Sequence, residues 1–208
     1  MALTESMSTH PKTARAEREV IDLILRRWSP RAFDPERPVA REDLLRLFEA
    51  ARWAPSSGNE QPWRFIVVDR AESPNEYTAL KEALTGRNPL WASTVPTFVM
   101  VVLRETLERN DQVNRHAWYD TGQAVGFLVL QATAMGLSTR QMEGFDREKA
   151  RAACAIPVGF DPAVIMAVGY AGDPASLQYD KHREAEQTPR SRKPLEEFVF
   201  SGAWGRKY

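Results

Sequence analysis

The sequence predicts a single domain built from both helices and strands. Two observations carry this prediction: apolar residues recur at helical spacing along several segments, and short apolar runs lie between turn-rich loops. At 208 residues, of which 43% are hydrophobic, the chain is long enough to bury one sizeable core. No internal repeat or low-complexity segment divides it, so one domain is expected.

Helices are expected at residues 14–27, 41–53, 76–84, 115–135 and 146–155. The longest becomes apolar on nearly all sides after Gln123, so we expect it to lie between other layers as the spine of the fold. Gly136 should end that helix, and Asp146 is a natural N-cap for the last one. Ala40, by contrast, is a poor cap for the helix at 41–53.

Strands are expected at residues 65–68, 97–103 and 163–168, because these runs are apolar and bounded by turn signals. Loops should cover residues 29–38, 55–62, 85–88 and 139–145. From Gly172 to Arg192 the chain is polar and irregular, and it then ends in an aromatic tail that includes Phe198, Trp204 and Tyr208. Such a tail needs a surface to lie against, and a partner subunit is one candidate.

Charge and targeting signals exclude several classes of partner. Lys and Arg total 28 and Asp and Glu total 28, so no broad attraction to nucleic acid or to an anionic membrane is expected. Residues 1–15 are polar and are predicted to form a flexible tail without a secretory signal or an anchor. The most apolar stretch, residues 124–137, is too short to span a bilayer. A cytoplasmic protein is therefore expected.

Several common catalytic and metal sites lack their motifs here. The chain contains no G-x-G-x-x-G, Walker phosphate loop, H-E-x-x-H or G-x-S-x-G. Its three histidines, His10, His116 and His182, are far apart in sequence, which disfavours a serine hydrolase and a zinc site. The single Cys154 excludes an internal disulfide and suits a small buried hydrophobe. No metal ligand is predicted.

Two pairs of basic residues are spaced for an anion. Arg27, Ser29 and Arg31 alternate just beyond a predicted helix, so in an extended segment their side chains point the same way. Arg190 and Arg192 repeat this spacing near the end of the chain. Guanidinium groups bind phosphate bidentately, so the two pairs could enclose one phosphomonoester. Solvated surface arginines are the alternative, and spacing alone favours it.

The loop at residues 55–62 is rich in neutral donors and acceptors. Ser56, Ser57, Asn59 and Gln61 lie between two prolines that stiffen the loop. Such groups suit the edge of a planar heterocycle. An ordinary turn is built from the same residues, so this pattern alone does not decide between a turn and a binding loop.

Three longer segments carry a resemblance to a known family. They read R-W-S-P-R-A-F at 27–33, A-P-S-S-G-N-E-Q-P-W-R-F at 54–65 and R-S-R-K-P-L-E-E at 190–197. In these segments the chain resembles the nitroreductase family of flavoproteins, and the match runs from about residue 21 to residue 207. The second segment is the most specific of the three. Trp28 is a departure, because the family more often has a basic or small residue there.

The resemblance implies an FMN site and names its residues. The phosphate and ribityl chain would be held by Arg27, Ser29, Arg31, Arg190 and Arg192. The isoalloxazine would be lined by Pro55, Ser56, Ser57, Asn59 and Gln61, some of them reaching the flavin bound mainly by the other subunit. The backbone amides of Glu143 and Gly144 would lie beside the reactive N5 edge, and Asn88 would contact the pyrimidine side.

The resemblance also implies a fold and an assembly. The family fold is a three-layer α+β fold, in which a mixed, mainly antiparallel sheet is sandwiched by helices. Residues 16–208 would form one FMN-binding domain, with a C-terminal arm directed toward the partner of an interlocked homodimer.

The implied activity is ping-pong hydride transfer from NAD(P)H through flavin N5 to a nitroaromatic, quinone or enone. The flavin would carry the chemistry, so no catalytic side chain is expected. Two alternatives stay open: a flavin-binding protein without turnover, and an atypical flavin enzyme of the same fold that fragments flavin or removes halides reductively. Ser29 argues against flavin fragmentation, because that branch tends to carry an acid at this position.

Overall fold

An antiparallel sheet forms the centre of the molecule. The structure is a computed structural model, and it describes residues 10–208. The sheet contains β1 (Trp63–Asp69), β2 (Thr97–Arg104), β4 (Phe160–Gly169) and β3 (Ser138–Met142), in that spatial order. All three pairings between these strands are antiparallel. The expected mainly antiparallel sheet is confirmed, and no parallel pair occurs within residues 10–208.

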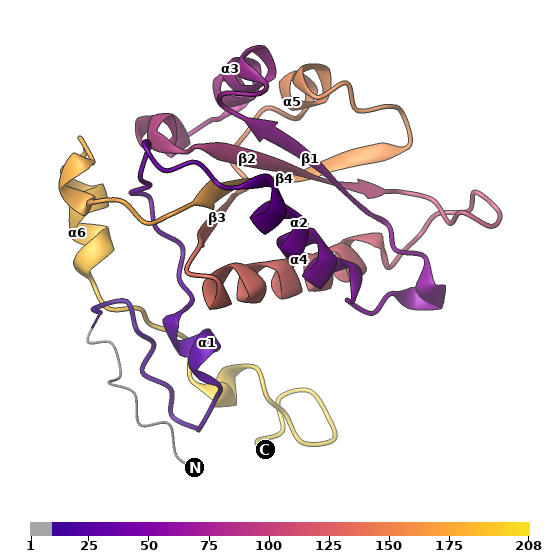
Figure 1. Cartoon of the computed structure of the whole chain (residues 1–208). Helices are drawn as coiled ribbons and strands as arrows, with labels where there is room; N and C mark the ends of the chain where they lie inside the picture. Colours follow the sequence, from indigo (N-terminus) through magenta and orange to yellow (C-terminus); the bar gives the residue numbers. More distant parts are fainter. Residues whose placement is uncertain (1–9) are drawn as a thin grey trace.

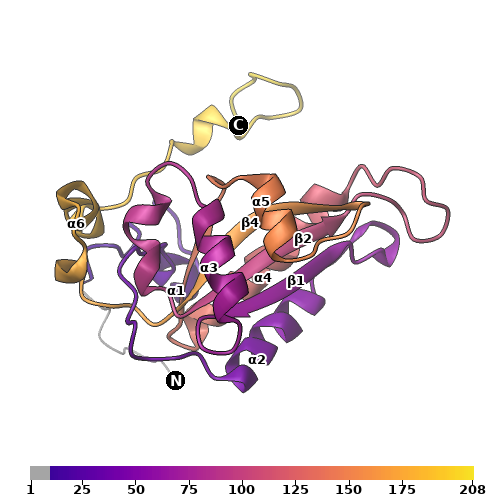
Figure 2. The same cartoon turned by 90° about the horizontal axis from the view of Figure 1, so that it is seen from above.

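Helices cover both faces of this sheet. α2 (Arg41–Arg52) and α4 (Ala117–Ala134) lie on one face, and α3 (Pro74–Ala83) and α5 (Arg147–Ala153) lie on the other (Figures 1 and 2). β2 is buried on both sides because its apolar side chains alternate between two cores: Val99 and Val101 face α4, whereas Phe98 and Met100 face α3. The three-layer fold is therefore confirmed.

Most of the expected elements form near their expected positions. α4 is the longest helix, and it is followed by Gly136, whose φ of 74° is the left-handed conformation that ends helices. Asp146 caps α5 as expected, because its carboxylate accepts from the backbone N–H groups of Glu148 and Lys149. Ala40 provides no side-chain cap for α2.

The first expected helix is mostly wrong. Residues 14–27 form only one short helix, α1 (Asp22–Arg26), which buries none of its side chains. Ile21 and Ile24, part of the apolar stripe that predicted the helix, are exposed. Within the protomer this stripe has no core to pack on, and packing of an apolar face supplies most of a helix's stability.

Two elements form where the sequence predicted loops. β3 occupies part of the expected loop at 139–145, and its sequence Ser-Thr-Arg-Gln-Met is too polar to read as a strand. α6 (Asp180–Gln187) forms in the stretch expected to be irregular. Its buried residues are His182 and Glu186, so a search for apolar stripes could not find it.

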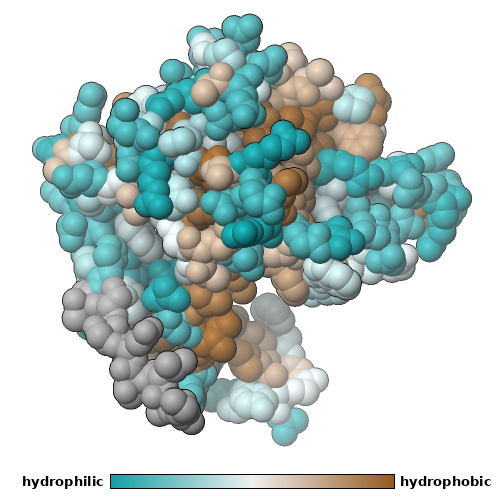
Figure 3. Space-filling view, viewed as in Figure 1, coloured by the Kyte–Doolittle hydropathy of each residue, from teal (hydrophilic) through white to brown (hydrophobic). Residues whose placement is uncertain are grey.

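The C-terminal arm projects from the body. Beyond Leu195 it ends in a small loop closed by a bridge between Phe200 and Lys207, and it extends away from the layers in both views (Figures 1 and 2). Trp204 is 92% exposed and Tyr208 is 93% exposed. A hollow with hydrophobic surface separates the arm from the body (Figure 3). Trp204 and Tyr208 are thus left almost uncovered by the rest of the chain.

The N-terminal segment lies beside α6. Lys12 is buried, and its ammonium group donates to the backbone carbonyls of Ala185 and Thr188 at the end of that helix. The expected flexible tail falls partly on residues 1–9, which lie outside the described residues. His10 and Lys12, within the expected tail, contact Trp28 and α6.

Candidate functional site

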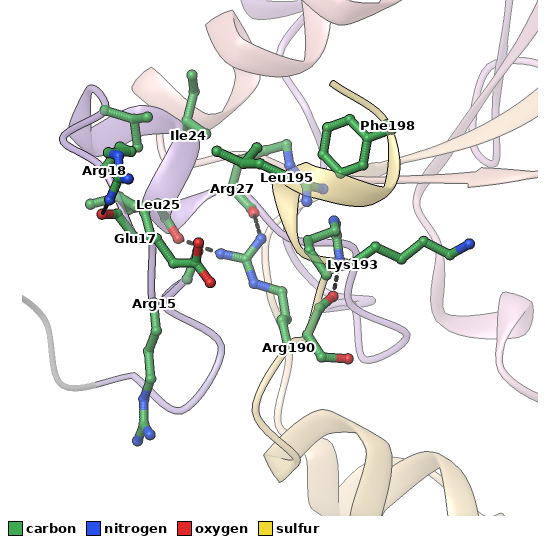
Figure 4. Close-up of a pocket in the computed structure, with 15 residues that line it drawn as sticks. Arg15, Glu17, Arg18, Ile24, Leu25, Arg27, Arg190, Lys193, Leu195 and Phe198 are labelled. Carbon is green, nitrogen blue, oxygen red and sulfur yellow. Dashed lines mark hydrogen bonds between the residues drawn. The ribbon is translucent and has the colours of Figure 1, made fainter. Parts of the chain in front are cut away.

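Three arginines from the two ends of the chain meet beside α1. Arg27 directly follows this helix, and its guanidinium donates to the Ser29 hydroxyl at 3.2 Å. Arg190 donates to the backbone carbonyls of Arg27 and Leu25, which Figure 4 shows as it reaches across from the C-terminal segment. Burial, and then the charge of Arg192, lower the pKa of Arg27. The structure therefore brings these predicted phosphate contacts together.

These arginines line a cavity of about 720 Å³ (Figure 4). Residues 14–20, α1 and the start of the arm form its walls. Leu195 and Phe198 contribute apolar surface, and among the described residues Glu17 is the one acidic residue in a lining that also contains several arginines. An amphipathic ligand with an anionic end suits such a lining.

Arg31 belongs to a second, more buried group. Its backbone N–H donates to the Glu186 carboxylate at 3.1 Å, and its guanidinium lies 3.7 Å from the same oxygen. Arg140, from β3, donates to the Ser29 carbonyl at 2.6 Å and lies over the Trp91 ring at 5.3 Å from its centre. Burial, and then Arg31, lower the pKa of Arg140 to about 10. Ser29 thus connects the two groups.

Among the described residues, most arginines of the two groups have no ion-pair partner. Glu186 pairs with Arg31, but Arg27, Arg140, Arg190 and Arg192 form no ion pair within residues 10–208. Burial, and then Arg27 and Arg192, lower the pKa of Arg190. Partly buried guanidinium groups that repel each other in this way are stabilised when an anion binds between them.

Four buried polar atoms in the same region also lack a partner among the described residues. They are Nε of Arg140, Nε of Arg190, Nδ1 of His182 and Oε2 of Glu186. Buried donors without acceptors are costly, so such atoms commonly mark the place of a ligand or an ordered water. The two arginine atoms are donors, and a phosphate group supplies acceptors. The residues present therefore fit the phosphorylated end of FMN.

The segment that carries Arg27 to Arg31 is fixed to the end of β4. Phe33 pairs with Ala171, the Asp34 N–H donates to the Tyr170 carbonyl at 3.0 Å, and the Gly172 N–H donates to the Ala32 carbonyl at 3.0 Å. A Cβ at Gly172 would lie 2.6 Å from the backbone of Phe33. Only glycine permits this close approach of the two backbones.

The second predicted group, in the loop after α2, is fixed to α4. The Ser57 N–H donates to the Asp120 carboxylate at 3.0 Å, and the Gln61 N–H donates to the Ser56 hydroxyl at 3.1 Å. Asn59 and Gln61 both have positive φ, 58° and 47°. Strained backbone of this kind is common at binding loops. The side chains of Pro55, Ser57 and Asn59 remain exposed.

The third predicted group lies between α3 and α5. The Asn88 side-chain amide donates to the Gly144 carbonyl at 3.0 Å, and the Thr85 N–H donates to the same oxygen at 2.9 Å. A Cβ at Gly144 would lie 3.1 Å from Nδ2 of Asn88. The structure therefore brings Asn88 and the Glu143–Gly144 segment into contact through a bond that no sequence pattern indicated.

The arginine groups and the loop after α2 lie at opposite ends of the molecule (Figure 1). Asp120, which holds the loop, is in the first turn of α4. Arg140, which holds Ser29, comes shortly after the other end of that helix. An 18-residue helix is about 27 Å long. A single chain therefore does not bring all the predicted cofactor contacts to one place.

Sequence reasoning missed four residues that support these groups: Lys12, Asp120, Arg140 and Glu186. Asp120 and Arg140 act through partners far away in sequence, which no local pattern reveals. The spacing of His182 and Glu186, i and i+4, is the signal that could have indicated a buried helix face.

The unusual Trp28 side chain does not line the arginine cavity. Its ring lies 5.3 Å from the His10 ring, and the Lys12 ammonium lies 5.6 Å from its centre. Trp28 therefore contacts the N-terminal segment.

Other candidate chemistry finds no site in the part of the chain that the structure describes. No three His, Cys, Asp or Glu side chains gather there as metal ligands. No helix within residues 10–208 is long and apolar enough to cross a membrane. Burial raises the pKa of the Cys154 thiol to about 11, so the thiol is protonated and inert at neutral pH.

Solved structures share this fold. A crystal structure described as an oxidoreductase containing FMN matches with a TM-score of 0.85 and 31% identity, over 93% of this chain and 97% of that one. A nitroreductase family protein from Streptococcus pneumoniae matches with a TM-score of 0.69 and 22% identity, over 86% of this chain and 98% of that one. The second match supports the fold alone.

Related sequences agree with the structural matches. A Thermus thermophilus protein named NADH dehydrogenase is 31% identical over 189 residues, which is 76% of this chain and 88% of that protein. An uncharacterized 15.4 kDa protein of Mycolicibacterium smegmatis is 31% identical over 147 residues, which is 68% of this chain and 97% of that protein. The model of the Nitroreductase family matches residues 24–89 and 84–170. The chain therefore belongs to the Nitroreductase family.

Proposed function

We propose that this protein is an FMN-dependent oxidoreductase that transfers hydride from NADH or NADPH to a small electron-poor acceptor. The observation that carries the proposal is the arginine site, where Arg27, Arg140, Arg190 and Arg192 have no ion-pair partner within residues 10–208. Arg27, Arg190 and Arg192 line one cavity, and guanidinium groups gathered in this way suit a phosphomonoester. The names of two relatives, an FMN-containing oxidoreductase and an NADH dehydrogenase, support the same activity.

The chain's own residues would bind and orient the cofactor. Arg27, Arg190 and Arg192 would hold the phosphate, and Ser29 and Arg31 would hold the adjacent chain of the ligand. Glu143 and Gly144 would present backbone amides to the ring, with Asn88 fixing that segment through the Gly144 carbonyl. The chemistry that bound FMN supplies is hydride transfer between a nicotinamide and an acceptor, so no side-chain acid or base is needed.

A homodimer would complete the site. The loop at 55–61 lies at the opposite end of α4 from the arginines, so a second copy of the chain would have to bring its loop to the first copy's cofactor. α4 exposes Trp118, Tyr119 and Phe127, and the arm exposes Trp204. Large exposed apolar surfaces of this kind are typical of subunit interfaces.

Anaerobic absorbance spectroscopy tests the proposal directly. We expect the purified protein to bind FMN and its flavin bands to bleach when NADH or NADPH is added. The nucleotide that bleaches the bands identifies the donor, and nitroaromatics, quinones and enones added afterwards should restore them. Bound flavin that stays oxidised would favour a storage protein or an atypical flavin enzyme. A protein that binds no FMN would overturn the proposal.

A further inference from the structure

Glu186 is a buried carboxylate that lies outside the sequence motifs at 27–33, 54–65 and 190–197. It lies on α6 and is 1% exposed, and it shares the buried face of that helix with His182. Glu184 lies on the same helix with its side chain in solvent. Burying a carboxylate is costly unless it has partners, and burial raises the pKa of Glu186. The contacts of Glu186 must therefore offset the cost of its burial.

The partner of Glu186 in hydrogen bonding is Arg31, which is a predicted cofactor contact. One carboxylate oxygen accepts from the Arg31 backbone N–H at 3.1 Å and lies 3.7 Å from the Arg31 guanidinium. The other oxygen has no hydrogen-bond partner among the described residues. The charge of Arg140 also acts on this carboxylate. Two guanidinium groups thus share one buried negative charge.

Hydrogen bonds at both ends hold the helix that carries Glu186. Lys12 donates to the carbonyls of Ala185 and Thr188, at the C-terminal end of the helix, where a cation also suits the helix dipole. Arg183 donates to the Leu177 carbonyl and to the Asp180 carboxylate, which ties the first turn of the helix to the preceding loop. Both ends of α6 are therefore anchored on either side of Glu186.

We propose that Glu186 is a positioning residue of the cofactor site, which fixes Arg31 for contact with FMN and separates its charge from that of Arg140. This inference rests on the proposed function, because Arg31 is a cofactor contact only if FMN binds. The carboxylate holds both the backbone and the guanidinium of Arg31, so it sets the direction of the side chain. Without it, Arg31 and Arg140 repel each other and Arg31 turns away from the ligand.

A double-mutant cycle tests this role. We expect Glu186→Gln to weaken FMN binding by about tenfold or more, since hydrogen bonds to charged groups are of that strength. The matched control is Glu184→Gln, the same substitution on the exposed side of α6, which should bind FMN like the unmodified protein. Arg31→Gln should weaken binding as well. The double variant should then bind no worse than Arg31→Gln alone, because Glu186 acts through Arg31.

FMN dissociation constants, measured by fluorescence quenching, decide between the outcomes. Equal affinity of Glu186→Gln and the unmodified protein would overturn the inference, as would tighter binding caused by loss of a negative charge near the phosphate. Losses that multiply in the double variant would also overturn it, because a merely structural residue acts independently of Arg31. Absence of FMN binding by the unmodified protein is a separate result, which overturns the proposed function together with this inference.

Discussion

Arg27 and Arg192 carry positive charge that no carboxylate balances within residues 10–208, and this makes their replacement informative. We expect Arg27→Ala combined with Arg192→Ala to weaken FMN binding by about a hundredfold or more, since each arginine is expected to contribute about 1.5–3 kcal/mol as a charged hydrogen-bond donor. The thermal midpoint of the apoprotein should change little. Fluorescence titration and thermal unfolding measure the two effects.

The control for this pair is Arg46→Ala combined with Arg52→Ala. Both residues are exposed arginines of α2, far from the arginine cavity. Unchanged FMN affinity in the Arg27 and Arg192 variant would contradict the phosphate assignment, whereas equal losses in both variants would indicate a general effect of net charge.

We expect the protonation of Glu186 to make the free energy of unfolding of the apoprotein depend on pH. Burial raises its pKa above the ordinary value of 4.5, so the folded state binds this proton more tightly than the unfolded state does. The stabilisation from the proton is complete below pH 4.5 and is lost as the pH rises through the raised pKa. Glu186→Gln removes this dependence.

Urea unfolding of the FMN-free protein between about pH 4 and pH 7 measures the effect. The free energy of unfolding of the unmodified protein, relative to that of Glu186→Gln, should fall as the pH rises over this window. If the free energies of unfolding of the two proteins change with pH in parallel, the pKa of Glu186 does not differ between the folded and unfolded states.

At the scale of residues, local motifs predicted the candidate cofactor contacts but not the residues that hold those contacts in place. The alternation of Arg27, Ser29 and Arg31 could be recognised because the chain there is extended. Arg140 and Glu186 could not, because they join that segment from residues more than a hundred positions away. Their partners are set by the packing of β3 and α6 and not by neighbouring sequence.

At the scale of elements, the junction between β4 and residues 32–34 depends on one glycine. We expect Gly172→Ala to lower the free energy of unfolding by about 2 kcal/mol, because its Cβ would lie 2.6 Å from the backbone of Phe33. Residues 32–34 would have to move to relieve this contact, and their displacement should also move Arg27 and Arg31 and weaken FMN binding. Chemical unfolding and FMN titration check both effects, and a variant as stable as the unmodified protein would show that the junction can adjust.

The loop after α2 depends in the same way on Asp120. Asp120→Ala removes a buried carboxylate that accepts from the Ser57 N–H at 3.0 Å, and we expect a loss of about 1.5–3 kcal/mol in stability. Asp120→Asn keeps an oxygen acceptor of the same shape and should lose less. Chemical unfolding of both variants gives the comparison. Equal stabilities of the two variants would mean that the bond to Ser57 contributes nothing.

The sequence predicted elements that present several apolar side chains to a core, and it missed elements whose buried side chains are few or polar. α2, α4 and β2 were predicted because each presents apolar residues to a core. β3 and α6 were missed because one is a polar edge strand and the other buries polar residues. Residues 14–27 were predicted as helix from the spacing of Val20, Ile21, Ile24 and Leu25, but only Asp22–Arg26 is helical and none of its residues is buried.

At the scale of the whole molecule, the separation of the arginines from the loop predicts complementation between two defective chains. One variant carries Arg27→Ala and Arg192→Ala, and the other carries Ser57→Ala and Asn59→Ala in the loop. Each homodimer has two damaged sites. A mixed dimer has one site with both defects and one site with none, so co-expression should restore about a quarter of the normal FMN content if subunits pair at random.

The FMN content of co-expressed protein, compared with that of the two variants mixed after purification, measures this recovery. No recovery in a mixed dimer of demonstrated composition would mean that each chain builds its own site. The sequence predicted the three layers, but only the three-dimensional structure shows the distance along α4 on which this test depends.

The arginine cavity is assembled from both ends of the chain, and this has a consequence for biosynthesis. Arg27 and Arg31 leave the ribosome early, whereas Glu186, Arg190 and Arg192 are translated more than 150 residues later. Domains begin to fold during synthesis, starting from the N-terminal side. A nascent chain can therefore form part of its sheet and helices before its phosphate site exists. Cofactor loading would be a post-translational event, open only to chains translated past residue 192.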